Sequence, residues 1–134
     1  MSDVMSPTSV DQALEMLTAT LGYLAAADAT EMTAEEQARC LRVLERATAI
    51  SAAARTSTLS AFTSGKGYSA DAQYSAKTWL VYKTGVTKGA AASHTAWMRR
   101  ALEHPAMFSA MAAGDVSEPV ARLLCQWKAP RHPF

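Results

Sequence analysis

The sequence predicts an all-α fold, with a long N-terminal helical hairpin followed by a helix-turn-helix-like bundle of short helices. Alanine is the commonest of the 134 residues, and 49% of the chain is hydrophobic against 19% charged, a composition typical of a globular helical domain. An apolar stripe near the N-terminus repeats every three or four residues, as an amphipathic helix requires. Its members are Val10, Leu14, Leu17, Leu21 and Leu24. Two glycines, Gly85 and Gly114, each close an apolar stretch shortly before an N-cap residue, which predicts two tight turns between helices.

The hairpin is expected within residues 1–64. Ser9 and Gln12 have the spacing of a capping box before a first helix that ends near residue 27. Thr33 and Glu36 have the same spacing before a second helix that nothing interrupts until Gly65. Its expected inner face follows Leu41, Leu44, Ala47, Ile50, Ala54 and Ala61 or Phe62, and residues 56–58 are expected to bend or fray. Because one hydrophobic face of each helix must be buried, the two helices are predicted to pair.

Four shorter helices are expected within residues 65–134. Ser75 is a suitable N-cap for a helix over 76–84, and Thr87 for one over 88–103. Pro105 suits the first turn of the next helix, and Ser117 suits the N-cap of the last one. The apolar residues expected to face the core are Trp79, Leu80, Val81, Ala91, Thr95, Met98, Leu102, Val120, Leu123, Leu124 and Trp127, whereas the position of Trp97 is left open. One domain with two subregions, 1–64 and 65–134, is therefore predicted.

The net charge of +1 conceals a division along the chain. Residues 1–64 hold four basic and eight acidic residues, a net of −4, whereas residues 65–134 hold nine basic and four acidic residues, a net of +5. A basic region suits a phosphate-backbone partner, because lysine and arginine displace its condensed counterions. A chance fluctuation of solvated charges explains the numbers equally well unless the basic residues share one face.

Several classes of protein do not fit the sequence. Cys40 and Cys125 stand apart from each other and from any histidine cluster, so neither a disulfide framework nor a zinc site is expected, and both thiols are expected to be reduced. No phosphate-binding glycine loop, cofactor motif, signal peptide or membrane-spanning stretch is recognised. The chain is expected to be a cytoplasmic protein that binds no cofactor, metal or membrane.

The order of motifs over residues 79–121 resembles the actinobacterial domain of unknown function 222, which includes the mycobacterial 13E12 repeat proteins. The resemblance is carried by Trp79-Leu80, by Thr84-Gly85-Val86-Thr87 and by Ala113-Gly114-Asp115-Val116-Ser117, with Gly89, Ala91, His94, Arg99, Leu102 and Pro105 between them. This domain commonly precedes an HNH endonuclease domain, so the resemblance implies a helical part of a nuclease-like protein, truncated at its C-terminus here. A looser resemblance links the same block to ParB-type helix-turn-helix domains.

The chain itself is expected not to be an enzyme. An HNH site needs a histidine that activates water and further histidine or asparagine ligands for a metal ion. The chain has no asparagine, and its three histidines, His94, His104 and His132, are dispersed. His94 has no acidic residue within one helical turn, so we interpret it as a surface or half-buried histidine rather than as a catalytic base.

Two functions remain open. The first is double-stranded DNA binding or DNA positioning, and its predicted contact residues are Lys83, Thr87, Lys88, Ser93, Arg99 and Arg100. These residues lack the arginine, asparagine or glutamine that direct base readout usually places near a helix N-terminus, so backbone contacts with weak sequence preference are expected. The alternative is a helical interaction module in which the long helix forms a homodimer without direct nucleic-acid contact.

Overall fold

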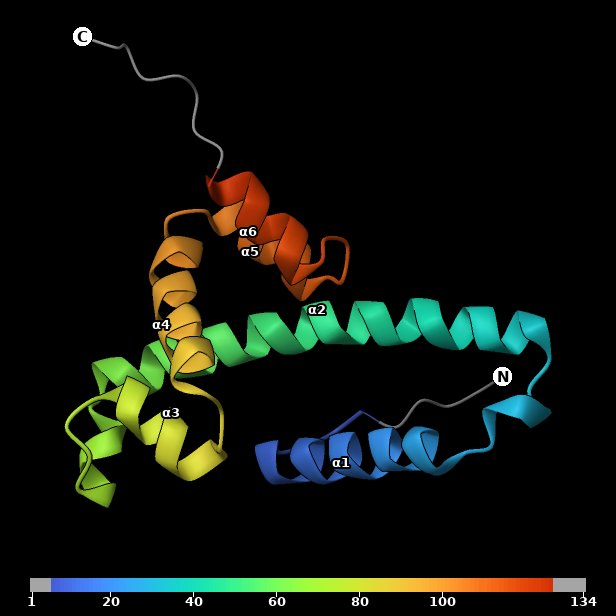
Figure 1. Cartoon of the computed structure of the whole chain (residues 1–134), viewed down its shortest axis with the longest axis horizontal. Helices are drawn as coiled ribbons and strands as arrows, with labels where there is room; N and C mark the ends of the chain where they lie inside the picture. The colour runs from blue at the N-terminus through green and yellow to red at the C-terminus, as the bar shows by residue number, and fades with distance from the viewer. Residues whose placement is uncertain (1–5, 127–134) are drawn as a thin grey trace, which may run out of the picture. The chain divides into compact units, whose positions relative to one another are not determined.

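A computed structural model describes residues 6–126 of the chain, and within them it confirms the all-α class (Figure 1). The α-helices and the two short 3-10 helices follow in the order α1 Val10–Ala26, η1 Ala29–Glu31, α2 Ala34–Ser64, η2 Gly67–Asp71, α3 Ala76–Thr84, α4 Lys88–Leu102, α5 Pro105–Ala112 and α6 Glu118–Gln126. No strand occurs in that part of the chain. Trp127, which the sequence places in the core, lies outside the described residues.

The chain forms two compact units, one up to Arg39 and the other from Cys40 onwards. We call them unit 1 and unit 2 and describe each by itself. The division falls inside α2, which contributes its first turns to unit 1 and the rest of its length to unit 2. The subregions 1–64 and 65–134, together with the pairing of the first two helices, stay a prediction.

Unit 1 consists of α1, η1 and the start of α2. Ser9 caps α1 by accepting a hydrogen bond from the Gln12 amide at 3.1 Å, while the Gln12 side chain accepts from Thr8 rather than from Ser9. The capping box of Thr33 and Glu36 is complete, with both reciprocal bonds at 3.0 Å. Val10, Leu14, Leu17 and Leu21 are between 41% and 75% exposed, so unit 1 itself does not supply the cover expected for this stripe.

The predicted inner face of α2 is wrong at several positions in unit 2, although Phe62 packs against buried residues as predicted. Ile50 and Ala54 are exposed, and the buried residues lie around the other side of the helix, namely Ala49, Ala52, Ala53, Thr56 and Leu59. The expected bend at residues 56–58 is also absent, since α2 runs unbroken to Ser64. The hydroxyl of the buried Thr56 donates to the Ala52 carbonyl at 2.9 Å, which satisfies it without disturbing the helical backbone.

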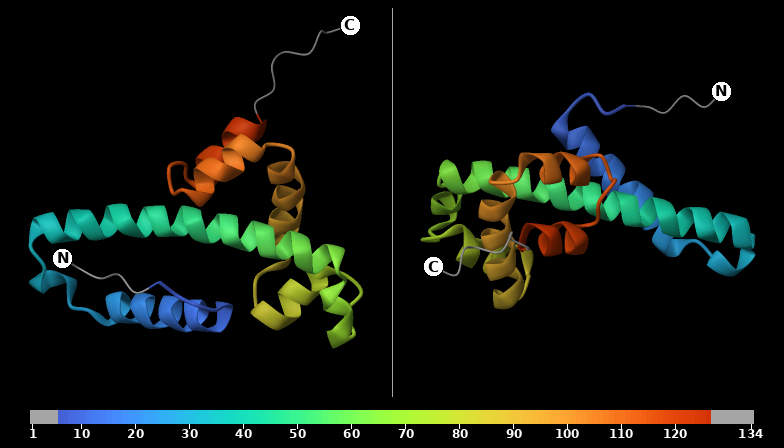
Figure 2. Two further views of the ribbon diagram at one scale, coloured as in Figure 1. Left: turned by 180° about the vertical axis from the view of Figure 1, so that it is seen from behind. Right: turned by 90° about the horizontal axis from the view of Figure 1, so that it is seen from above.

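Two hydrophobic clusters hold unit 2 together, and the helices that carry them are drawn in Figure 2. The first cluster joins α2, α4, α5 and α6 through Ala52, Ala53, Trp97, Ala101, Met111, Ala121 and Cys125. The second joins α2, α3 and α4 through Leu59, Ala76, Leu80, Ala91 and Met98, with Phe62, Tyr68 and Trp79 packed at its side. Small residues dominate the first cluster, so its helices are able to approach one another closely.

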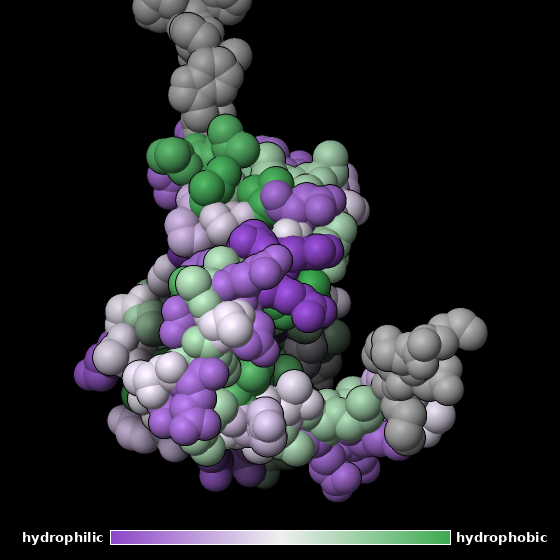
Figure 3. All heavy atoms as spheres, turned by 90° about the vertical axis from the view of Figure 1, so that its right-hand side faces the viewer, coloured by the Kyte–Doolittle hydropathy of each residue, from purple (hydrophilic) through white to green (hydrophobic). Residues whose placement is uncertain are grey.

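Three leucines expected in the core are exposed instead. Leu102, Leu123 and Leu124 are 61%, 66% and 51% exposed, and Val120 is also exposed. The apolar patch over α6 is visible in Figure 3. The physical reason is that alanine and cysteine occupy the tight helix contacts, whereas the larger side chains lie on the flanks of the same helices.

Candidate nucleic-acid interface

The connection from α3 to α4 is a tight turn of the kind predicted. Ser75 caps α3 by accepting from the Thr78 amide at 3.2 Å, and Gly85 ends the helix with φ +79°. Such a left-handed backbone strains any residue that has a Cβ atom. Thr87 then caps α4 by accepting from the Ala90 amide at 3.0 Å. Thr87 was predicted to contact DNA, but its hydroxyl oxygen is used to cap α4. Only the exposed part of its side chain is left for a ligand.

One side of α4 faces solvent and is basic. Lys88, Ala92, Ala96 and Arg99 are exposed, and their spacing of four, four and three residues places them along one face of a helix. Lys88 and Arg99 are about 17 Å apart along the axis at 1.5 Å per residue. Two of the six predicted contact residues thus share a solvent-facing surface, with only alanine methyl groups between them.

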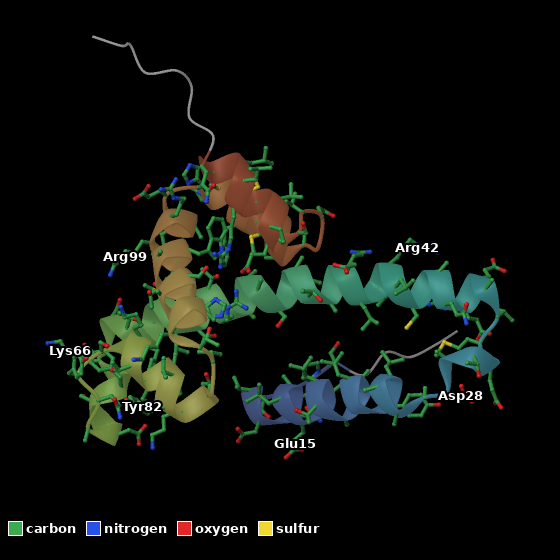
Figure 4. All side chains as sticks on the ribbon, in the orientation of Figure 1. Glu15, Asp28, Arg42, Lys66, Tyr82 and Arg99 are labelled. Carbon is green, nitrogen blue, oxygen red and sulfur yellow. The ribbon has the colours of Figure 1, made fainter. Side chains whose placement is uncertain are left out.

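A cavity of about 390 Å³ adjoins this face and brings in a lysine that the sequence analysis missed. It lies between the end of α2, η2, α3 and α4, and both Lys77 and Arg99 line it with the hydroxyl side chains Thr63, Ser75 and Thr95. No carboxylate is among its lining residues. We call it the Lys77–Arg99 cavity. Arg99 and Lys66 project outwards on the same side of unit 2 (Figure 4), so the positive charge extends beyond the cavity.

The structure places Ser93 and Arg100 on a different side of α4. The Ser93 hydroxyl accepts a hydrogen bond from Arg122 of α6, and Arg100 donates to the Cys125 carbonyl at 3.2 Å. Both residues lie about 100–140° around the helix from Lys88 and Arg99, because successive residues rotate by about 100°. The six predicted residues therefore do not form one contact surface.

Lys83 lies near the end of α3 and pairs with Asp71 of η2 at 3.8 Å. Asp71 also accepts a hydrogen bond from the indole nitrogen of Trp79 at 2.8 Å. Because the Lys83 and Asp71 side chains are each more than 40% exposed, water screens this pair and weakens it. Lys83 is thus partly neutralised locally, which makes it a poorer phosphate ligand than Lys88 or Arg99.

A network of ion pairs and hydrogen bonds joins α2, α4 and α6. Glu118 pairs with Arg55 at 2.5 Å and with Arg122 at 3.4 Å, and the Arg122 guanidinium lies 5.5 Å from the centre of the Trp97 ring. His94 is half-buried beside these groups. Burial lowers the pKa of His94, and the positive charge of Arg55 lowers it further. The imidazole is therefore biased towards its neutral form.

The two described tryptophans are packed rather than presented to a ligand. Trp79 contacts the Phe62 ring at 4.6 Å between centroids, in agreement with its predicted core position. Trp97 is only 4% exposed and belongs to the first cluster, which settles the position that the sequence left open. Trp97 therefore has no free face of the kind on which a single-stranded base stacks.

The described residues show neither a metal-ligand cluster nor a membrane-spanning helix. Between residues 6 and 126, no group of three or more histidine, cysteine or acidic side chains could hold a metal ion. In that same segment, no helix is long and apolar enough to cross a bilayer. Cys40 and Cys125 are free thiols, and burial raises the pKa of the Cys125 thiol.

Comparisons with known proteins do not identify the chain. No family description, no curated protein and no solved structure matches it. The resemblance to the domain of unknown function 222 therefore stays a prediction from the motifs at residues 79–121.

Proposed function

We propose that unit 2 binds double-stranded DNA through its sugar-phosphate backbone, with α4 as the helix that faces the duplex. The observation that carries the proposal is the shared solvent face of Lys88 and Arg99 on a helix that follows a tight glycine turn. Lys77 adds a third positive charge beside Arg99 at the cavity. The free amides and the positive dipole end at the start of α4 also favour a phosphate.

The proposed contact is weakly sequence-specific. Between Lys88 and Arg99 the exposed face offers the methyl groups of Ala92 and Ala96, which can touch a thymine methyl group but cannot read a hydrogen-bonding pattern. Arginine and lysine at the two ends hold phosphates, which position a protein on DNA without reading its sequence. Affinity is therefore expected to depend strongly on salt and little on sequence.

The test is fluorescence anisotropy with a labelled duplex of about 20 base pairs, at salt concentrations from about 50 to 200 mM. The double variant Lys88→Ala/Arg99→Ala should weaken binding and lower the slope of log K against log salt by about two, since each lost phosphate contact removes about one. Arg39→Ala/Arg42→Ala removes the same charge from exposed positions on α2 and is the matched control. The proposal fails if the wild-type chain shows no duplex affinity at low salt, or if the control loses as much affinity as the test variant.

The wider proposal is that this DNA-positioning region belongs to an HNH endonuclease-associated protein. It is supported by the order of motifs at residues 79–121. The genomic sequence downstream of Phe134 tests it, because an HNH motif in frame is expected there and its absence would remove the association.

The alternative proposal is a helical interaction module that forms a homodimer. The dimer is expected to form through the long helix α2, and the exposed Leu41, Val43 and Ile50 on that helix favour it, since exposed apolar residues often mark a contact with another protein. The exposed Leu123 and Leu124 of α6 add a second apolar area. Light scattering at micromolar concentration should then report a dimer, and a strict monomer would eliminate this reading.

A further inference from the structure

A second basic cavity lies on the opposite flank of the exposed alanines of α4. It measures about 300 Å³ and is lined by Ser93, Ala96, Trp97, Arg100, Arg122 and Gln126. Ala96 also lines the Lys77–Arg99 cavity. The exposed residues Ala92 and Ala96, which we call the alanine ridge, therefore separate two cavities, each of which is lined by two basic side chains.

The two guanidinium groups of this second cavity are held in place by the fold. Arg100 donates through Nη1 to the Cys125 carbonyl at the end of α6. Arg122 donates to Ser93 and pairs with Glu118 four residues earlier on the same helix. Because both side chains are restrained before any ligand arrives, little of their rotamer freedom would be lost on binding.

The charge around this cavity favours an oxyanion. Arg100 and Arg122 both line it, and no carboxylate does so. Glu118 balances part of the Arg122 charge but is shared with Arg55, whereas Arg100 meets only a backbone carbonyl, so the two guanidinium groups keep a net positive charge. The planar guanidinium group matches the oxygen geometry of a phosphate, which makes two arginines a suitable pair of ligands for one.

We propose that the Arg100–Arg122 cavity is a second phosphate-binding site, and that the two cavities hold phosphates from opposite strands of one duplex while the alanine ridge enters the major groove. This inference rests on the proposed function and extends it. The major groove is about 12 Å wide and admits a helix of about 10–12 Å diameter. Alanine adds the least bulk beyond the backbone apart from glycine, so the ridge permits a close approach of α4 to the groove.

The proposal predicts a preference for duplex over single-stranded DNA. A single strand has one phosphate backbone and lacks the second one at the fixed width of a groove, so it can occupy the two cavities only by bending around the helix. The duplex presents both backbones at once, so both cavities contribute to its binding. The preference should disappear when the second cavity is blocked.

Gln126→Glu is the variant that tests this site. Gln126 is exposed and lines the cavity, so a carboxylate there places a negative charge next to Arg100 and Arg122 without removing either arginine. Duplex binding should weaken about tenfold, as expected for one lost charge-assisted contact, and the salt slope should fall by about one. Binding to a single strand of the same length should change less. Ala54→Glu, at an exposed position of α2, is the charge-matched control.

A second variant, Ala96→Glu, places the carboxylate on the ridge between both cavities and should weaken duplex binding more than Gln126→Glu does. Circular dichroism verifies that each variant keeps its helical content. The second site is refuted if Gln126→Glu weakens duplex binding no more than Ala54→Glu does. The proposed function would still hold in that case if Lys88→Ala/Arg99→Ala abolished duplex binding. Equal losses for duplex and single strand would refute the two-strand arrangement. Competition by inorganic phosphate alone at micromolar concentration would show a site for the free ion instead and would also overturn it.

Discussion

The two glycine turns of unit 2 each contain a left-handed glycine but have different surroundings. Gly85, between α3 and α4, and Gly114, between α5 and α6, both have φ +79°. A Cβ atom at Gly85 would meet nothing within 4 Å, whereas one at Gly114 would lie 3.2 Å from Nε of Arg46 and 3.3 Å from Cδ1 of Ile50. The first turn is open to solvent and the second is packed on α2.

The helices that follow the two turns differ in the residues that they expose to solvent. The outer face of α4 is basic, with Lys88 and Arg99 exposed, whereas the outer face of α6 is apolar, with Leu123 and Leu124 exposed. The cap residues predict where both helices begin, but they do not predict what each helix presents to solvent. A left-handed glycine can therefore precede a candidate ligand-binding helix in one place and a scaffold helix in the other.

The largest expected effect separates the two turns directly. Gly114→Ala should destabilise the fold by about 2–4 kcal/mol, because a left-handed alanine costs about 1–2 kcal/mol and the close contact with α2 adds to it. Gly85→Ala should cost only the strain, about 1–2 kcal/mol. Urea denaturation of both variants measures the difference. Equal losses would contradict the view that only the second turn is packed.

A smaller loss of stability is expected when the ion pairs of Glu118 or of Lys83 are broken. Glu118→Gln leaves Arg55 and Arg122, which are 36% and 24% exposed, without their shared carboxylate and should cost about 1–3 kcal/mol. Lys83→Gln breaks the exposed pair with Asp71 and should cost less than about 1 kcal/mol. Thermal unfolding of the two variants compares them. A larger loss for Lys83→Gln would reverse the proposed ranking of the two networks.

The smallest effect is a pH dependence confined to the α2–α4–α6 junction. The pKa of His94 is lower in the folded protein than its ordinary value of 6.5, chiefly because burial disfavours the charged imidazole. As the pH falls below about 6.5, the unfolded chain therefore binds a proton before the folded chain does, which favours unfolding. The urea midpoint should fall between pH 7.5 and pH 5.5, and it should fall less in His94→Gln. Identical pH profiles would contradict this assignment.

The helix boundaries were predictable from local chemistry. Ser75, Thr87 and the Thr33–Glu36 pair form the caps that their sequence positions predict, and Pro105 begins α5. These features depend on residues within one helical turn of each other, so no knowledge of the tertiary structure is needed to recognise them.

The buried faces and the site were predictable only in part. The sequence analysis favoured Leu102, Leu123 and Leu124 for the core because they are large and apolar, yet Ala101, Ala121 and Cys125 occupy the contacts. Which side of α4 meets α6 depends on that choice, and so the sequence could not show that Ser93 and Arg100 lie on a different flank of α4 from Lys88 and Arg99. Lys77 carries no local signal, because its place beside Arg99 depends on how α3 packs on α4. The only sequence feature that points to Arg122 is its position four residues after Glu118, which predicts an ion pair on one helix face.

The alanines of the two clusters affect how firmly α4 is held. A buried alanine loses no rotamer freedom on folding, whereas a buried methionine or glutamine loses up to about 2 kcal/mol of it. Ala91, Ala101 and Ala121 are at most 1% exposed, so much of the contact around α4 is made by groups that have a single conformation. The helix cannot shift by exchanging rotamers at these points. The spacing between the two basic cavities is thus set by backbone-to-backbone distances, and any residue larger than alanine at Ala91 or Ala121 would change it.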